Sequence, residues 1–138
     1  MLKRWGVSED RAIWFEHGAS EPGSALGCGV DHAHLHLIID GPFSFDQFAS
    51  EVSKARGLKW ERRQASTVHH AVKGCESYLV AASAEQAVLA QDVEQAGSQF
   101  FRRVIAKLAD QPEAWNYRTH PHLENVRESI KNFAGRIS

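Results

Sequence analysis

Five stretches of the chain combine β-forming residues with a period of two or with short apolar runs, both of which are typical of strands. They are residues 12–16, about 30–39, 58–62, 77–82 and 86–90. A short polar connection between the last two suits a hairpin, and strands around residues 30–39 are expected to form an antiparallel sheet. The pattern therefore predicts a sheet of about five strands.

Three other stretches have apolar residues three and four positions apart, the spacing of an amphipathic helix. The first starts in a capping box, Ser44 with Gln47, and is expected to end near Gly57. The second is expected to be capped by Ser98. The expected buried residues are Phe45, Phe48, Ala49, Val52 and Ala55; Phe100, Phe101, Val104, Ile105 and Leu108; and Leu123, Val126, Ile130 and Phe133. Helices packed on an antiparallel sheet make an α+β fold, and 138 residues suit one domain over 1–138.

The strand at about 30–39 carries three histidines, which are its candidate functional residues. His32, His34 and His36 alternate with small or apolar residues, so they share one face of the strand. Leu35 and Leu37 share the other face, which we expect to pack on the core. Residues two apart on a strand are about 6–7 Å apart along it. The rings are therefore expected to lie in a row at the surface or in a cleft, converging on one anion or one metal.

Three interpretations of this row remain open on the residues alone. One is a solvated strand face that happens to be rich in histidine. Another is a metal site of the three imidazoles with His17 or Asp31, since neutral imidazole is a common ligand of zinc. The third is a phosphate site in which a neutral imidazole attacks phosphorus and its neighbours stabilise the transferred group.

Composition and charge narrow the classes of partner. With 16 basic and 17 acidic residues, the net charge is −1, which does not provide the clustered basic surface of a nucleic-acid-binding protein. Cys28 and Cys75 lack a disulfide or zinc pattern and are read as free thiols of a reducing compartment. No apolar run approaches the roughly 20 residues that span a membrane, and the first residues do not form a signal peptide. We therefore expect a cytoplasmic protein without a membrane or nucleic-acid partner.

The segment His32-Ala33-His34-Leu35-His36-Leu37-Ile38 resembles, at all seven positions, the signature of the histidine triad (HIT) superfamily of nucleotide hydrolases and transferases. Three further segments are similar to those of bacterial HIT-like proteins: Phe15-Glu16-His17-Gly18, Ser98-Gln99-Phe100-Phe101-Arg102-Arg103, and the tail from Trp115 to Val126. The resemblance implies action at the α-phosphate of a nucleotide conjugate, such as a dinucleoside polyphosphate or a nucleoside phosphoramidate.

The resemblance also implies roles for individual residues. His34 would be the nucleophile that takes the nucleotidyl group, His36 would bond the phosphate oxygens, and His32 would orient the ring of His34. Many HIT proteins have Ser or Thr where this chain has Gly29, whose backbone N–H would still bond a phosphate oxygen. The chemistry requires no metal cofactor, and a Mg²⁺-bound nucleotide is compatible with it.

Residues outside the triad are further candidates for substrate contacts. His17 and Glu16 precede or enter the loop that leads to the triad, and they either assist phosphate binding or belong to a solvated turn. Gln99 or Arg103 either reaches the phosphates or a dimer partner, or lies on a solvated helix face. The aromatic segment at Trp115 either covers the core or borders a base pocket.

The segment before the triad, 31 residues, is shorter than the front half of a usual HIT domain. The alternatives to an enzyme are therefore a nucleotide-binding HIT-like protein without significant catalysis, or the His-ligated metal site. HIT-like proteins commonly dimerise, so the resemblance also implies a homodimer.

Overall fold

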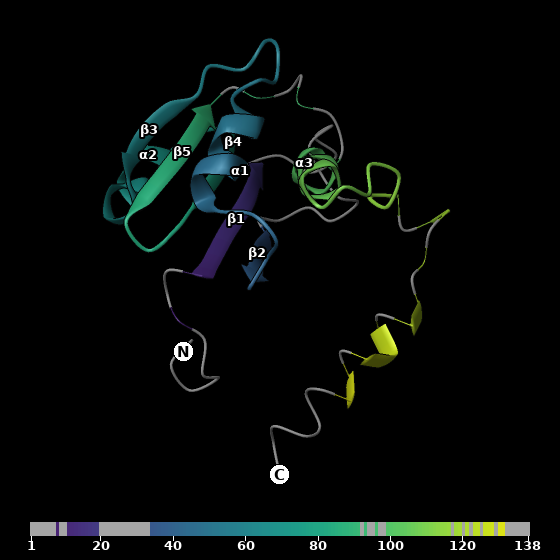
Figure 1. Ribbon diagram of the computed structural model, residues 1–138. Coiled ribbons are helices and arrows are strands. Elements are labelled where there is room, and N and C mark those ends of the chain that lie inside the picture. The colour runs from purple at the N-terminus through teal and green to yellow at the C-terminus, as the bar shows by residue number, and fades with distance from the viewer. Residues whose placement is uncertain are drawn as a thin grey trace.

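The computed structural model describes residues 8, 11–19, 34–91, 93, 96, 99–116, 118–119, 121, 123–124, 126–128 and 130–131. The fold is α+β, as predicted, and its centre is one antiparallel sheet of five strands in the order β2-β1-β4-β5-β3 (Figure 1). The strands are β1 (Ala12–Ala19), β2 (His34–Ile39), β3 (Glu61–Gln64), β4 (Ser77–Ala82) and β5 (Gln86–Gln91). The predicted hairpin is formed by β4 and β5.

Helical segments cover both faces of this sheet. They are α1 (Phe45–Val52), the 3₁₀ helix η3 (Ala65–Thr67), α2 (Val68–Val72) and α3 (Phe100–Leu108). On one face, Phe48 of α1 and Phe101 of α3 pack against Phe15 of β1 in the larger hydrophobic core. On the other face, Val68 of α2 packs against Val80 and Leu89 in a smaller core. The two faces of β1 therefore lie in different environments.

Helix α1 begins as predicted and ends earlier than predicted. Ser44 is the N-cap, and its side chain and that of Gln47 form the reciprocal bonds of a capping box. The helix ends at Val52 rather than near Gly57, since Ser53 is its C-cap. The Ser53 hydroxyl donates to the carbonyl oxygen of Ala49 at 2.7 Å, a local bond that competes with helix continuation.

Strand β1 is longer than predicted, which changes the position of His17. The strand was expected to end at Glu16, but it continues to Ala19 because β4 pairs with it as far as Ser77. Gly18 allows this extension, since the ring of Tyr78 lies where a side chain at residue 18 would project. His17 is consequently a strand residue and not part of a loop.

The remaining elements differ from the predictions mainly at their ends. Strand β3 begins at Glu61, and the exposed His69 and His70 belong to α2. In helix α3, Phe100, Phe101 and Val104 of the predicted stripe are buried, and Ile105 and Leu108 are partly buried against the same core. The expected cap Ser98 lies outside the described residues.

The last predicted stripe is exposed rather than buried. The described positions between 123 and 131 are helical, and the pieces drawn in yellow run away from the sheet (Figure 1). Leu123, Val126 and Ile130 are 58%, 52% and 63% exposed, so helical periodicity alone did not identify a core contact here. Within the described part of the chain, no helix has the length and apolar character needed to cross a membrane.

Candidate functional site

Pairing between β1 and β2 brings histidines of two chain segments onto one face of the sheet. His17 is the register partner of His34, and Phe15 is the partner of His36. The ring centroids of His34 and His36 are 6.3 Å apart, and those of His17 and His36 are also 6.3 Å apart. This separation agrees with the spacing expected from strand alternation. Three imidazoles therefore gather at one place, although His32, the first histidine of the motif, lies outside the described residues together with Gly29.

The histidine face of β2, and not its leucine face, points toward the larger core. The ring of His36 stacks on Phe15 with a centroid distance of 4.7 Å and an angle of 8° between the planes. Leu35 and Leu37 are 67% and 43% exposed on the opposite face, which contradicts the expectation that they pack on the core. The reason is that α1 and α3 cover the side of the sheet to which His36 and Phe15 belong. Alternation predicted two faces but did not indicate which one the helices would cover.

His17 is the most buried of the three imidazoles. Its side chain packs edge to face on Phe101 of α3, at 4.9 Å between ring centroids, and the residue is only 8% exposed. Burial, reinforced by the nearby rings of His36 and His34, lowers the pKa of His17 to about 4. The ring is therefore neutral at pH 7. Such a residue has little surface for a substrate, which argues against the expectation that it contacts phosphate from a loop.

His36 is held in its neutral form by its surroundings as well. Burial lowers its pKa below the ordinary value, and the nearby His34 and Arg102 lower it further. Arg102 belongs to α3, so the site is completed by a helix some 60 residues downstream in the sequence. A guanidinium remains protonated at any working pH. The positive charge of the site at pH 7 is consequently supplied by Arg102 rather than by a protonated His36.

Glu16 does not join this cluster. Since neighbouring strand residues face opposite ways, it lies on the other face of β1 from His17. There its carboxylate accepts a hydrogen bond from the Tyr78 hydroxyl. Burial and this carboxylate raise the pKa of Tyr78, so its hydroxyl stays protonated and can donate to Glu16. Glu16 therefore faces away from the histidines with which it was expected to assist phosphate binding, and its bond to Tyr78 links β1 to β4.

Gln99 marks the beginning of α3. It is the N-cap residue with a left-handed backbone, at φ 60°, and its side-chain oxygen accepts a hydrogen bond from Arg102 at 3.4 Å. Gln99 thus contacts the arginine that faces His36.

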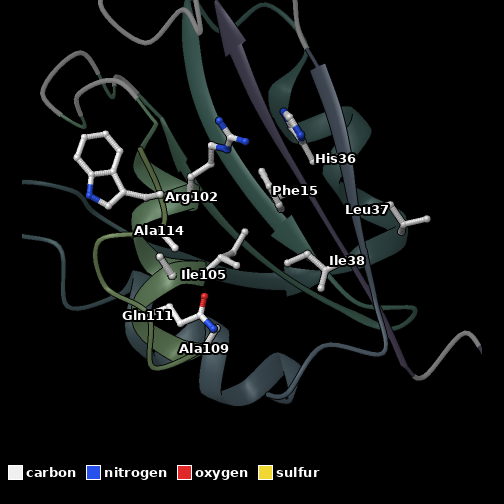
Figure 2. Close-up of a pocket in the computed structure, with 11 residues that line it drawn as sticks. Phe15, His36, Leu37, Ile38, Arg102, Ile105, Ala109, Gln111 and Ala114 are labelled. Atoms are coloured by element: carbon white, nitrogen blue, oxygen red, sulfur yellow. The ribbon is translucent and has the colours of Figure 1, made fainter. Parts of the chain in front are cut away.

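A pocket of about 420 Å³ opens next to His36, between β2 and α3 (Figure 2). It is lined by Phe15, His36, Leu37, Ile38, Arg102, Ile105, Ala106, Ala109, Gln111, Ala114 and Trp115. Trp115 was one candidate for a base pocket, whereas Arg102 and Gln111 were not identified from the sequence. One feature of the sequence could have identified Arg102. It lies three residues before Ile105 on the same helix, so the two side chains are neighbours on the helix surface.

Among the described residues, no group of three or more His, Cys, Asp or Glu side chains is arranged to hold a metal ion. His32 and Asp31, two members of the metal site considered above, lie outside those residues.

The chain was also compared with protein-family models, curated proteins and solved structures, and none of the three comparisons gives a match. The resemblance to HIT proteins consequently depends on the triad segment and on the three further segments of the sequence that are similar to theirs.

Proposed function

We propose that this chain is a nucleotide hydrolase or nucleotidyltransferase that acts at the α-phosphate of a nucleotide conjugate, a dinucleoside polyphosphate or a nucleoside phosphoramidate. The observation that carries the proposal is the pair of imidazoles of His34 and His36 on one strand face, with the Arg102 charge opposite and a pocket alongside. In this proposal His34 would serve as the nucleophile, His36 as a hydrogen-bond donor and Arg102 as a permanent cation toward one phosphate.

In this proposal His34 attacks the α-phosphorus. A P–N bond forms as the bond to the leaving group breaks, and the leaving group takes the electron pair and, in the net reaction, the N–H proton that the His34 ring loses. Water or another acceptor then attacks phosphorus, the P–N bond breaks, and a proton of the acceptor restores the imidazole of His34. His36 is neutral, so it has one N–H to donate to a phosphate oxygen, and Arg102 offsets the charge of the transferring group.

His17 has a supporting role in this proposal. It packs edge to face on Phe101 and is the register partner of His34, so its ring lies beside the nucleophile on the same face of the sheet and has little exposed surface. His32, which the resemblance assigns to orienting His34, keeps that role in the proposal. Both assignments give the nucleophile a defined orientation, which a two-step transfer requires.

We also propose that the chain forms a homodimer. In the described part of the chain, β2 is an edge strand, and three apolar side chains on its outer face are exposed: Leu35, Leu37 and Ile39. An exposed apolar edge strand is a common pairing surface. Light scattering of the purified protein tests this, with Leu35→Glu expected to give the monomer; a monomeric unsubstituted protein would contradict it.

The function is tested by incubating the protein with adenosine phosphoramidate and with diadenosine polyphosphates, followed by chromatography of the products. We expect release of AMP. If nucleotide binds in calorimetry but no product forms from any of these substrates, the chain is a nucleotide-binding protein instead. Zinc present at one equivalent in the purified, untagged protein would favour the metal site.

A further inference from the structure

The arginine of the proposed site is a long side chain on an exposed part of α3. In Figure 2 the guanidinium of Arg102 and the ring of His36 lie together at the upper end of the pocket. An exposed arginine samples many rotamers, and holding it in one of them costs conformational entropy. A cation stabilises a transferring phosphate best when it is already oriented. A neighbouring group that keeps Arg102 directed toward His36 would therefore contribute to the proposed reaction.

Gln99 is such a neighbour. Its side-chain oxygen accepts a hydrogen bond from the Arg102 guanidinium at 3.4 Å, across one turn of the helix. A glutamine amide is uncharged, so it orients the guanidinium without offsetting the positive charge, as a carboxylate at this position would. The charge of Arg102 therefore stays free for a phosphate while its direction is restricted.

The backbone of Gln99 has a conformation that glutamine seldom adopts. Its φ of 60° and ψ of 30° are left-handed, whereas an N-cap residue usually has an extended backbone, as Ser44 of α1 has with φ −80° and ψ 164°. A residue with a Cβ atom costs free energy in the left-handed region, and glycine does not. Such conformations persist where the surrounding contacts determine them, and they cluster at functional sites. Glutamine at a position where glycine would be less strained indicates that its amide has a role.

Contacts on both sides of Gln99 hold this turn in place. The backbone N–H of Arg103 donates to the Gln99 carbonyl oxygen at 3.2 Å, and the Arg103 side chain donates to the carbonyl oxygen of Ala96 at 3.0 Å. The backbone N–H of Ala96 donates to the carbonyl oxygen of Val93 at 2.9 Å, and that of Val93 donates to the hydroxyl of Ser77 in β4 at 3.1 Å. The first turn of α3 is thus tied to the sheet, so Gln99 has a fixed position relative to the strands.

We infer that Gln99 is a positioning residue, whose amide holds the guanidinium of Arg102 toward His36 from a left-handed turn at the start of α3. The inference rests on the proposed function for the role of Arg102 as the cation beside the phosphate. Gln99 acts through Arg102 and not by contact with the phosphates, which was one expectation from the sequence.

A double-mutant cycle tests whether Gln99 acts through Arg102. It compares kcat/KM on adenosine phosphoramidate for the unsubstituted protein, Gln99→Ala, Arg102→Gln and the double variant. We expect Gln99→Ala to lower kcat/KM about 5-fold, the effect of one ordinary hydrogen bond, and to have no further effect in the Arg102→Gln background.

Asp110→Ala is the matched control for this cycle. Asp110 is exposed and also has a left-handed backbone, with φ 57°, just beyond the other end of α3. The substitution should leave kcat/KM unchanged.

The titration of His36 provides a measurement that does not require turnover. Burial, His34 on the same strand and Arg102 on α3 lower the pKa of His36, and the ring centroid of His17 on β1 lies 6.3 Å away. A guanidinium that moves away should raise the His36 pKa. Gln99→Ala should therefore raise it by less than Arg102→Gln does, and should add nothing in the Arg102→Gln background. Proton NMR of the ring signals makes this comparison.

A glycine variant separates the amide from the backbone. Gln99→Gly removes the amide and relieves the left-handed strain, so it should be at least as stable as Gln99→Ala in thermal unfolding. It should nevertheless show the same loss of kcat/KM, about 5-fold. Full activity in Gln99→Gly together with a loss in Gln99→Ala would assign the effect to the backbone and would overturn the inference.

Two further results would overturn it as well. One is a Gln99→Ala variant that changes neither kcat/KM nor the titration of His36. The other is a loss that is equally large in the Arg102→Gln background, since Gln99 would then act independently of Arg102. If NMR shows the coupling but no substrate is turned over, the positioning of Arg102 by Gln99 stands and the proposed enzymatic function fails.

Discussion

Two pairs of histidines in this chain show how position determines what an imidazole can do. The strand pair, His34 and His36 on β2, lies two residues apart on one face, against Phe15 and opposite Arg102. The helix pair, His69 and His70 on α2, is adjacent in sequence, with ring centroids 5.6 Å apart, and both residues are exposed. Burial, the nearby His34 and the Arg102 cation lower the pKa of His36 in the strand pair, while both residues of the helix pair are exposed. The helix pair therefore supplies matched controls for substitutions in the strand pair.

The largest difference in kcat is expected between the variants His34→Ala and His69→Ala. The first should lower kcat on adenosine phosphoramidate by at least about 10³-fold, because it removes the atom that bonds to phosphorus. The second should change kcat by less than about twofold. Steady-state kinetics of both variants, with circular dichroism to check folding, makes the comparison. Equal effects, or retained turnover in His34→Ala, would remove His34 from the mechanism.

Arg102 is the charged group that distinguishes the surroundings of the strand pair. Arg102→Gln should lower kcat/KM about 10²-fold, the usual loss when one preorganised donor to a developing charge is removed. It should also raise the pKa of His36, since a nearby positive charge disfavours protonation. Proton NMR titration of the histidine ring signals measures this shift. Arg56→Gln, at an exposed arginine elsewhere, is the control; an unchanged His36 titration in Arg102→Gln would contradict the assignment.

The buried His17 is expected to make the free energy of unfolding depend on pH, in contrast to the exposed His70. Its folded pKa of about 4 lies below the unfolded value of about 6.5, so between these pH values the unfolded state binds more protons. Stability is therefore complete above the unfolded pKa and is lost as pH falls toward the folded one, by about 2 kcal/mol between pH 7 and pH 5. Urea unfolding should show this loss in the unsubstituted protein and in His70→Gln, and a smaller one in His17→Leu. An equal pH dependence in all three would refute it.

The smallest effect on activity is expected for Glu16. Because this carboxylate lies on the opposite face of β1 and bonds Tyr78, Glu16→Gln should change kcat and KM by less than about twofold. It should still lower the free energy of unfolding by about 1–2 kcal/mol, since a charge-assisted hydrogen bond is weakened. Kinetics and urea unfolding of the same preparation separate the two effects. A large fall in kcat/KM of Glu16→Gln without loss of stability would instead indicate that Glu16 contacts the substrate.

Much of the fold followed from local patterns. The capping box at Ser44, the hairpin of β4 and β5 and the buried stripe of α3 were predicted because each depends on residues close in sequence. The ends of elements were less predictable. Strand β1 extends through His17 because of its partner β4, and that pairing is not encoded near residue 17.

The sequence predicted only part of the candidate site, because local patterns do not show which distant elements pack together. Strand alternation placed His34 and His36 on one face, but it did not identify the covering helix, so the leucine face was expected to be buried. Arg102 was not recognised, because its neighbour His36 is 66 positions away and only tertiary packing joins them. The alternation that grouped the histidines also separates Glu16 from His17, since adjacent strand residues face opposite ways.

The central claim is that His34 carries the nucleotidyl group during the reaction. It is tested most directly by mixing the protein with adenosine phosphoramidate, quenching within milliseconds to seconds, and measuring the intact mass and the modified peptide. We predict a transient increase by one adenylyl group, located at His34, absent in His34→Ala and present in His69→Ala. An adduct on another residue, or AMP formation with no adduct at any quench time, would contradict the account.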